Sequence, residues 1–527
     1  MPDNPLIAGL LRADAYPHPV QAVRLIETHC AWVLLTGEFA YKIKKPVNFG
    51  FLDFSTLEKR RFYCEEEIRL NRRFAPQIYL DVVAIGGSEQ QPKIAGGEAA
   101  LEYAVRMRQF ADGGLLSQLA EQGRLEPAHI DQLVEAIGRF HQSAEHAAPG
   151  SACGEPGHIH HWIRENFQHI RPALDEAPDI EQLQRLEQWS EQERQRIDTL
   201  LTKRRRDGFV RECHGDLHLG NITLIDGQVT PFDCIEFNPE LRWIDVQSET
   251  AFLIMDLDDR GYRGFAHRFL NLYLQFTGDY AGLGVLRYYL VYRALVRAKV
   301  AMLRRAQTLP GSQDFRQATA DYHQYAQLAS GYTMQRTTVL LIAHGLSGSG
   351  KSTVAAQLCE YAGMIQIRSD IERKRLAGVE AVARSGSEVG AGLYTADRTE
   401  QTYRQLAALA TRALQAGYSV IVDATFLEQS RRADFQALAK SLRVPFGILH
   451  CQTGDAELER RIAARAAAGT DPSEAGLDVL YAQRRNRQPL TADERRHTVD
   501  VDTARIDMAG LQTAVERLAQ PSGEPRE

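Results

Sequence analysis

The residues best suited to chemistry in the second half of the chain form the sequence GLSGSGKST. Gly345, Gly350, Lys351 and Ser352 fill the pattern G-x-x-x-x-G-K-S, between an apolar run and a run of helix-forming residues. Glycines let backbone N–H groups turn inward on phosphate oxygens, and the start of the helix adds partial positive charge. Lys351 would reach the β- and γ-phosphates, and the Ser352 hydroxyl would bind Mg²⁺. The sequence therefore predicts an ATP site made by Gly345, Leu346, Ser347, Gly348, Ser349, Gly350, Lys351, Ser352 and Thr353.

Two aspartates follow later apolar runs, Asp370 in IRSD and Asp423 in VIVDATF. Ligands of open α/β sheets bind beyond the carboxyl ends of the strands, where both carboxylates are expected. Asp370 could accept a proton from a substrate hydroxyl, or could be the N-cap of the helix that follows. Both interpretations stay open. Asp423 is predicted to hold Mg²⁺ through water or to orient the substrate.

An arginine-rich run, 460–465, follows the fourth predicted strand of this half, and a loop with Gly469 comes after it. The planar guanidinium fork meets phosphate oxygens in pairs, which suits a lid over a transferring phosphate. The alternative is an exposed helix face.

The first half carries a second constellation, in RECHGDLHLGNITLIDGQVTPFDCIEF. Phosphoryl transfer needs a carboxylate for the hydroxyl proton, a carboxamide for Mg²⁺ and a second carboxylate to hold Mg²⁺ against the phosphates. Asp216, Asn221 and Asp233 match these roles in order and spacing. Two short predicted strands flank the turn at Gly227 and would bring the three together. Asp216 and Asn221 as simple loop caps remain the alternative.

Four stretches of the second half together resemble the AAA-type P-loop kinases related to zeta toxins and polynucleotide kinases, over about residues 337–500. They are GLSGSGKST, RSDIERKRLAG, VIVDATF and RRIAARAAAGTDPSEAGLDVLYAQRR. The resemblance implies Asp370 as the candidate base and Arg461 or Arg465 as lid residues. It does not carry over a substrate.

The HGDLHLGN motif resembles the Brenner-type loop of aminoglycoside phosphotransferases, which share the protein-kinase-like fold. That fold needs a lysine on a strand and a glutamate on the next helix. The sequence FAYK resembles the lysine strand, with Lys42 as the phosphate contact. Lys44 lies two residues on and on the same face, so it is a rival. Glu67 is the predicted helix partner, and Glu66 is the alternative.

The chain as a whole, from about residue 25 to residue 490, resembles bacterial bifunctional aminoglycoside phosphotransferase-like/ATP-binding proteins. It departs from the kinase pattern in two places: no G-x-G-x-x-G loop precedes Lys42, and Cys234 follows Asp233 where protein kinases carry phenylalanine. Asp245 is interpreted as structural. Kinship of fold does not establish antibiotics as substrates.

The pattern of expected helices and strands that must position these residues changes near residues 331–337. Before this boundary we expect strands at 31–35, 39–43 and 79–85, a helix at 55–74, and mostly helices after residue 127. After it, strands at 339–343, 364–368, 419–422 and 446–450 alternate with helices, which predicts a parallel sheet. The predicted fold class is α/β and α+β: a protein-kinase-like domain at 1–330 and a P-loop NTPase domain at 337–520.

Composition narrows the functional classes. The 527 residues carry a net charge of −6, so there is no global electrostatic case for nucleic acid or for an anionic membrane. The seven scattered cysteines include no CxxC pair, which fits a reducing compartment, and no leader segment is recognised. A cytoplasmic protein is expected.

These features predict an ATP- and Mg²⁺-dependent phosphotransferase with two nucleotide sites, which transfers the γ-phosphoryl group to a hydroxyl of a small-molecule acceptor. One alternative is an ATP-binding sensor in which one or both sites are inactive. Another is a nucleic-acid end kinase in the second half, with a basic groove at Arg368, Arg373, Lys374 and Arg375. The sequence identifies neither the acceptor nor the oligomeric state.

Overall fold

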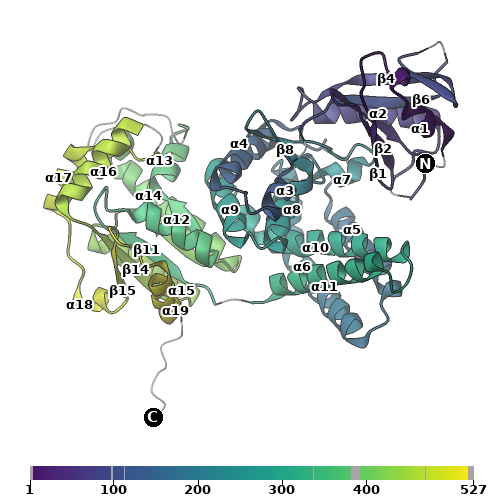
Figure 1. Cartoon of the computed structure of the whole chain (residues 1–527). Coiled ribbons are helices and arrows are strands. Elements are labelled where there is room, and N and C mark those ends of the chain that lie inside the picture. The colour runs from purple at the N-terminus through teal and green to yellow at the C-terminus, as the bar shows by residue number, and fades with distance from the viewer. Residues whose placement is uncertain are drawn as a thin grey trace. The chain divides into compact units, whose positions relative to one another are not determined.

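The computed structural model describes residues 4–50, 52–96, 99–111, 113–335, 337–380, 392–468 and 471–519 (Figure 1). The predicted loop at Gly469 lies outside these residues. The chain forms two compact units: unit 1 comprises Met1–Arg260 and Tyr292–His323, and unit 2 comprises Gly261–Val291 and Gln324–Glu527. Among the described helices, none combines the length and the apolar content that a bilayer-crossing segment requires.

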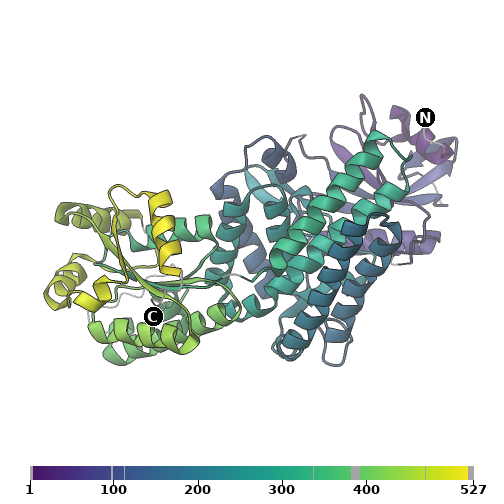
Figure 2. The same ribbon diagram turned by 90° about the horizontal axis from the view of Figure 1, so that it is seen from below.

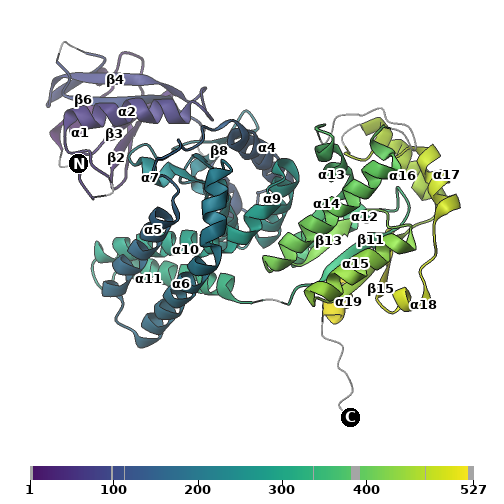
Figure 3. The same cartoon turned by 180° about the vertical axis from the view of Figure 1, so that it is seen from behind.

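Unit 1 contains an antiparallel sheet of six strands in the order β1-β2-β3-β6-β4-β5. The strands are β1 (Arg24–Glu27), β2 (Ala31–Leu35), β3 (Phe39–Lys44), β4 (Tyr79–Ser88), β5 (Gln91–Ile94) and β6 (Glu102–Arg108). Helix α2 (Leu57–Asn71) lies along this sheet (Figures 1 and 3). It begins after Thr56, whose hydroxyl accepts a hydrogen bond from the Lys59 amide.

The central strand β3 contributes apolar side chains to a core cluster on each of its faces. Tyr41 and Ile43 pack into one core cluster, and Ala40 packs into another together with Cys64 and Ile68 of α2. Because side chains alternate along a strand, Lys42 and Lys44 share the face that carries Ala40. Both lysines therefore face helix α2.

The rest of unit 1 is mainly helical and includes two short antiparallel strand pairs, β7–β10 and β8–β9. These strands are β7 (Val210–Glu212), β8 (Ile222–Ile225), β9 (Gln228–Pro231) and β10 (Trp243–Asp245). The helices are α1 (Pro5–Leu10), α3 (Leu116–Glu121), α4 (Pro127–Ser143), α5 (Pro156–Ile170), α6 (Ala177–Arg206), α7 (Pro239–Arg242) and α8 (Val246–Asp259). Helices α5 and α6 pack side by side (Figure 2). Residues 292–306 of α10 (Leu283–Ala306) and 313–323 of α11 (Gln313–Thr333) also belong to this unit.

Asp245 has a structural role, in agreement with its interpretation from the sequence. Its two carboxylate oxygens accept hydrogen bonds of 2.7 and 2.8 Å from the Arg204 guanidinium at the end of α6. Both side chains are 2% exposed. This buried ion pair fastens α6 to the start of α8.

Unit 2 contains a parallel sheet of five strands in the order β12-β13-β11-β14-β15, which confirms the predicted parallel sheet. The strands are β11 (Leu340–His344), β12 (Ile365–Arg368), β13 (Val420–Asp423), β14 (Phe446–Gln452) and β15 (Thr498–Asp502). The fifth strand, β15, was not predicted. Only Val501 of its five residues is buried, so the segment has no apolar run to reveal it.

Helices cover both faces of this sheet (Figures 1 and 3). They are α12 (Lys351–Ala362), α13 (Ser369–Leu376), α14 (Ala396–Gln415), α15 (Gln429–Leu442), α16 (Asp455–Ala468), α17 (Leu477–Asn486), α18 (Ala492–Arg495) and α19 (Met508–Ala519). Helices α12 and α19 share one apolar core with Leu341, Ile421 and Leu449 of the strands. Helix α12 ends at Gly363, which has a left-handed φ of 70°.

Helix α9 (Arg263–Thr277) belongs to unit 2, although the sequence-based boundary placed it in the first domain. The side chain of Asn271 donates a hydrogen bond of 2.9 Å to the Met364 carbonyl and accepts one of 2.7 Å from the Gln366 amide. Arg268 forms an ion pair of 2.5 Å with Glu360 of α12. Helix α9 thus satisfies backbone groups of β12, the edge strand of the sheet.

We predict that Asn271→Ala destabilises unit 2 through β12. The change leaves a buried carbonyl and a buried amide without their partner, which should cost about 1–3 kcal/mol of unfolding free energy. Hydrogen-exchange mass spectrometry of peptides that cover residues 351–368 would measure this loss. Arg263→Ala, an exposed change on the same helix, is the control and should leave exchange unaltered. Equal protection in both variants would contradict the role of Asn271.

Candidate active sites

The loop between β11 and α12 has the backbone that phosphate binding requires. Gly345, Gly348 and Gly350 have φ values of 151°, 82° and 83°, a region that favours glycine. A Cβ atom on Gly345 would lie 2.5 Å from the Cys451 carbonyl oxygen, and one on Gly348 would lie 2.9 Å from the Leu458 carbonyl oxygen. No other residue fits these two positions without moving backbone. The loop ends at the start of helix α12, and backbone amide groups at a helix start form anion-binding sites.

Several polar groups of this loop are engaged by the protein itself. The Lys351 ammonium donates a hydrogen bond of 2.8 Å to the Leu346 carbonyl, and burial lowers the pKa of Lys351. The Ser347 amide donates one of 2.8 Å to the Gln483 side chain of α17. The Ser349 hydroxyl is 2% exposed and has no hydrogen-bond partner among the described residues. An orphan hydroxyl at the start of a helix fits an anionic group.

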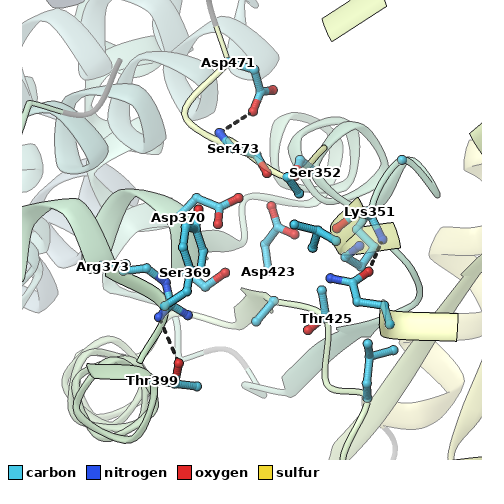
Figure 4. Close-up of a pocket in the computed structure, with 18 of the residues that line it drawn as sticks. Lys351, Ser352, Ser369, Asp370, Arg373, Thr399, Asp423, Thr425, Asp471 and Ser473 are labelled. Carbon is cyan, nitrogen blue, oxygen red and sulfur yellow. Dashed lines mark hydrogen bonds between the residues drawn. The ribbon is translucent and has the colours of Figure 1, made fainter. Parts of the chain in front are cut away.

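A cavity of about 550 Å³ opens beside this loop. Figure 4 shows Ser352, Asp370 and Asp423 pointing into the same hollow, from α12, α13 and the end of β13. Helix α13 begins at Ser369, and its N-cap residue is Arg368. The interpretation of Asp370 as an N-cap is therefore wrong, because Asp370 lies inside the first turn.

Gln366 holds the Asp423 carboxylate, and sequence reasoning missed it. Its side-chain nitrogen donates a hydrogen bond of 3.0 Å to Asp423 Oδ2, and its oxygen accepts one of 3.4 Å from Gln275 of α9. The sequence feature that could have revealed Gln366 is its position as the single glutamine in the strand IQIR. A buried amide in such a strand needs a partner on each side, and here the two partners lie 91 and 57 residues away.

The two predicted lid arginines line the same cavity. Arg461 donates hydrogen bonds of 2.9 and 3.0 Å to the side chain and carbonyl of Thr503, and its guanidinium lies against Gly350. Arg465 donates a hydrogen bond of 2.6 Å to the Ala475 carbonyl. Arg461 thus lies beside the phosphate loop, and Arg465 lines the same cavity.

The four basic residues proposed for a nucleic-acid groove are engaged within the protein. Arg368 lies 3.5 Å from Asp471, and Lys374 lies 3.0 Å from Glu474. Arg373 donates hydrogen bonds of 3.0 and 3.1 Å to Leu393 and Thr399, the latter visible in Figure 4. The Arg375 guanidinium binds Glu372 and the Gln275 carbonyl. These contacts use the side chains that would otherwise meet a nucleic-acid backbone.

In unit 1 the structure brings together the three residues of the first constellation. The Asn221 carboxamide donates a hydrogen bond of 3.0 Å to Asp216 Oδ2 and another of 3.0 Å to the Asp216 carbonyl. The Phe232 amide binds the Asn221 carbonyl at 2.9 Å, which places Asp233 beside it. Asp233 has a φ of 64° and donates its amide to the Tyr79 hydroxyl at 3.0 Å. The loop is held in a conformation that the sequence alone would disfavour.

The Asp216 carboxylate is kept ionised. Burial would raise its pKa, but the charge and hydrogen bond of His218, 3.5 Å away, and the charge of Arg297 bring the pKa well below its ordinary value. An ionised carboxylate at a cavity can accept the proton of a hydroxyl.

A buried network positions the loop that carries Asp216. The Glu249 carboxylate accepts a hydrogen bond of 2.7 Å from the Gly215 amide and lies 3.0 Å from His141 Nε2. Burial raises the pKa of Glu249, but the hydrogen bond and charge of His141, the charge of His214 and the hydrogen bond from the Gly215 amide together outweigh it and lower the pKa to about 2. Arg293 donates a hydrogen bond of 3.2 Å to the Gly215 carbonyl. The backbone of Gly215, next to Asp216, is thus held by Glu249 through its amide and by Arg293 through its carbonyl.

Glu67 binds both candidate lysines. Its Oε1 lies 2.9 Å from the Lys42 ammonium and its Oε2 lies 2.7 Å from the Lys44 ammonium. Lys42 also pairs with Asp233, whereas Lys44 pairs with Glu236, which the sequence did not single out. Lys42, Lys44 and Asp233 line a cavity of about 320 Å³ together with Asp216, and the Lys42 side chain is 14% exposed whereas that of Lys44 is 1% exposed.

Glu66 does not contact either lysine among the described interactions. It forms an ion pair of 2.9 Å with Arg69 and one of 3.3 Å with Arg242. The geometry therefore favours Glu67 over Glu66 as the helix partner.

Comparison with known proteins identifies both halves of the chain. Residues 63–286 match the family described as "Phosphotransferase enzyme family", and residues 340–490 match the one described as "AAA domain". The uncharacterized protein Rv2004c of Mycobacterium tuberculosis (strain H37Rv) is 32% identical over 512 residues, which are 96% of each chain. The same identity and coverage hold for the uncharacterized protein Mb2027c of Mycobacterium bovis.

Solved structures of kinases also resemble parts of this chain. A choline/ethanolamine kinase family protein from Mesorhizobium loti is 11% identical and covers 60% of this chain and 92% of its own, with a TM-score of 0.37. A gluconokinase from Sinorhizobium meliloti 1021 is 21% identical and covers 35% of this chain and 94% of its own, with a TM-score of 0.25. The resemblance to aminoglycoside phosphotransferase-like and AAA-type P-loop kinases is confirmed, as is the predicted fold class.

We predict that Lys42→Met and Lys44→Met separate catalysis from stability. Lys42→Met should lower phosphoryl transfer by unit 1 about 100-fold or more, while Glu67 keeps Lys44 as its partner. Lys44→Met leaves buried carboxylates uncompensated and should lower the free energy of unfolding by about 3–5 kcal/mol. Transfer assays and urea unfolding followed by tryptophan fluorescence would measure both. The reverse pattern would make Lys44 the phosphate contact.

Proposed function

Because the chain belongs to the family of the mycobacterial protein Rv2004c and carries two kinase-type domains, we propose that it is a phosphotransferase with two nucleotide sites. Each site uses ATP and Mg²⁺ and transfers the γ-phosphoryl group to a hydroxyl of a small molecule. The observation that carries this proposal is that Asp216 and Asp233 line one cavity and that the Asn221 carboxamide is hydrogen-bonded to Asp216. The phosphate loop of unit 2 supports it independently.

In the proposed N-terminal domain, residues 1–330, Asp216 accepts the proton of the acceptor hydroxyl. Asn221 and Asp233 offer the oxygen ligands that Mg²⁺ prefers. Bound there, Mg²⁺ would neutralise charge on the phosphates. Lys42, oriented by Glu67, contacts the phosphates from the strand side.

In the proposed C-terminal domain, residues 337–520, the backbone from Gly345 to Lys351 cradles the phosphates. Ser352 and Asp423 supply the oxygen atoms of a second Mg²⁺ site, and Asp370 faces the acceptor. The acceptor hydroxyl and the triphosphate would meet in the cavity that these side chains line. Arg461 and Arg465 are placed to neutralise charge on the transferring group.

A cytoplasmic location forms part of the proposal. The enzyme would need ATP, and all seven cysteines are free thiols in the structure. Free thiols are typical of a reducing compartment.

The activity of unit 1 is tested with Asp216→Asn in the full-length chain. Loss of the base should lower transfer from labelled ATP by roughly 10²–10⁴-fold while the fold is retained. Phosphate release and transfer are measured in the Lys351→Ala background, so that unit 2 is silent. Unchanged turnover would refute the proposed role of Asp216 and favour a nucleotide sensor.

The activity of unit 2 is tested with Lys351→Ala. Without its ammonium, the loop should lose at least 100-fold in turnover and should no longer retain ATP tightly. Equilibrium binding of labelled ATP to the Lys42→Met, Lys351→Ala double variant, compared with each single variant, assigns the sites. Asp370→Asn serves as the matched variant that should retain nucleotide and lose transfer. Retained transfer in that variant would remove Asp370 from the proposed mechanism.

A further inference from the structure

A hollow leads away from Asp216 between helices α5 and α10 of unit 1. Its inner part is the 320 Å³ cavity at Asp216, and its outer part is a cavity of about 790 Å³. The two cavities share the lining residues Trp162, Glu165, Lys299, Val300 and Leu303. This size range is that of small-molecule sites. The hollow starts at the proposed base and is therefore a candidate acceptor site.

Three residues on one face of α5 line this hollow and carry buried polar atoms that the described part of the protein does not satisfy. Asn166 is 1% exposed, and neither its side-chain nitrogen nor its oxygen has a hydrogen-bond partner in the described part of the chain. The same holds, among the described residues, for the indole nitrogen of Trp162 and for Glu165 Oε2. All three residues line the inner cavity, at positions one turn apart on the helix.

Leaving such groups unpaired is costly for a folded protein, since each lost its hydrogen bonds to water on burial. Buried amide groups are almost always bonded, so a carboxamide with both ends free calls for an explanation. A bound molecule that carries hydrogen-bond donors and acceptors supplies one. Asn166 offers both kinds of group, the indole offers a donor, and the carboxylate offers an acceptor.

The charges at this end of the inner cavity balance. Glu165 lies 3.6 Å from the Lys299 ammonium, which neutralises it. The Arg293 guanidinium is already used: it donates hydrogen bonds of 3.1, 3.2 and 3.1 Å to the Ser248 carbonyl, the Gly215 carbonyl and the Ser248 hydroxyl. The pair of Glu165 and Lys299 therefore leaves no net charge to attract a cationic or an anionic acceptor. Recognition must come from neutral hydrogen bonds and from the aromatic surface of Trp162.

We propose that this hollow binds a neutral polyhydroxylated acceptor, a sugar or a polyol, whose secondary hydroxyls bond Asn166, Glu165 Oε2 and the Trp162 indole. The proposal rests on the proposed function of unit 1. The reacting hydroxyl gives its proton to Asp216 and forms a bond to the γ-phosphorus of ATP. The bond from that phosphorus to the bridging oxygen breaks, and ADP leaves.

The test compares Asn166→Leu with a matched control in the Lys351→Ala chain, where transfer comes from unit 1. The panel contains D-glucose, D-mannitol and myo-inositol, with D-glucosamine, choline and kanamycin as cationic counterparts. We expect transfer to a neutral member, with KM raised about tenfold or more by Asn166→Leu and kcat little changed. The melting temperature should stay the same or rise, because the change removes unpaired buried groups.

Ser190→Ala is the matched control. The Ser190 hydroxyl is also buried and lacks a partner among the described residues, but Ser190 lines neither cavity. It should leave KM unchanged. A fall in melting temperature with unchanged KM in Asn166→Leu would show a structural role and overturn the proposal.

The outcomes for acceptor and for function are distinguishable. Preferred transfer to a cationic compound would overturn the neutral-acceptor proposal and leave the proposed function of unit 1 standing. If unit 1 splits ATP in an Asp216-dependent way but no neutral member receives phosphate, the acceptor class is wrong. Absence of all Asp216-dependent turnover would remove the proposed function as well.

Discussion

A buried charge must be compensated by a partner of opposite charge. In unit 1 the ion pairs that satisfy this constraint are centred on one carboxylate, that of Glu67. Glu67 is fully buried and takes an ammonium group on each of its oxygens. Those ammonium groups in turn reach Asp233 and Glu236 on a loop that follows some 190 residues later. Without the two lysines, three buried or half-buried carboxylates would repel one another. The same contacts therefore hold the sheet, the helix α2 and the proposed metal loop in one arrangement.

The parts of the site that could be predicted are those whose residues are close in sequence. The phosphate loop and the run from Asp216 to Asp233 each lie within a short stretch, so spacing alone indicated their proximity. Glu236 and Gln366 escaped prediction because their partners lie far away along the chain. The fold class followed from alternation of apolar runs, but β15 has a single buried residue and gave no such signal. Patterns over short stretches of sequence predicted structure, whereas pairs of polar groups far apart in the chain could not be predicted.

Helix α9 shows that the two family matches and the two compact units divide the chain differently. The match to the phosphotransferase family runs to residue 286, yet the contacts of residues 261–291 lie with unit 2. Asn271 and Gln275 bind β12 and Gln366, and Gln366 binds the Asp423 carboxylate. A chain cut at the apparent domain boundary would thus remove support from the C-terminal site. This dependence gives a physical reason for the two kinase-type halves to remain in one polypeptide.

The two sites also differ in how they satisfy their polar groups before any ligand arrives. In the phosphate loop, Lys351 bonds the Leu346 carbonyl and Gln483 bonds the Ser347 amide, so a triphosphate must exchange these bonds for its own. Part of its interaction energy is then offset by the bonds it displaces. At Asn166 the buried amide has nothing to displace among the described residues, and a hydroxylated ligand gains the full difference between an orphaned and a paired group. Discrimination by such groups is strong, because a ligand that lacks a matching hydroxyl leaves them unpaired. The proposed acceptor side of unit 1 is therefore suited to selectivity, whereas the phosphate loop of unit 2 bonds some of its polar groups within the protein.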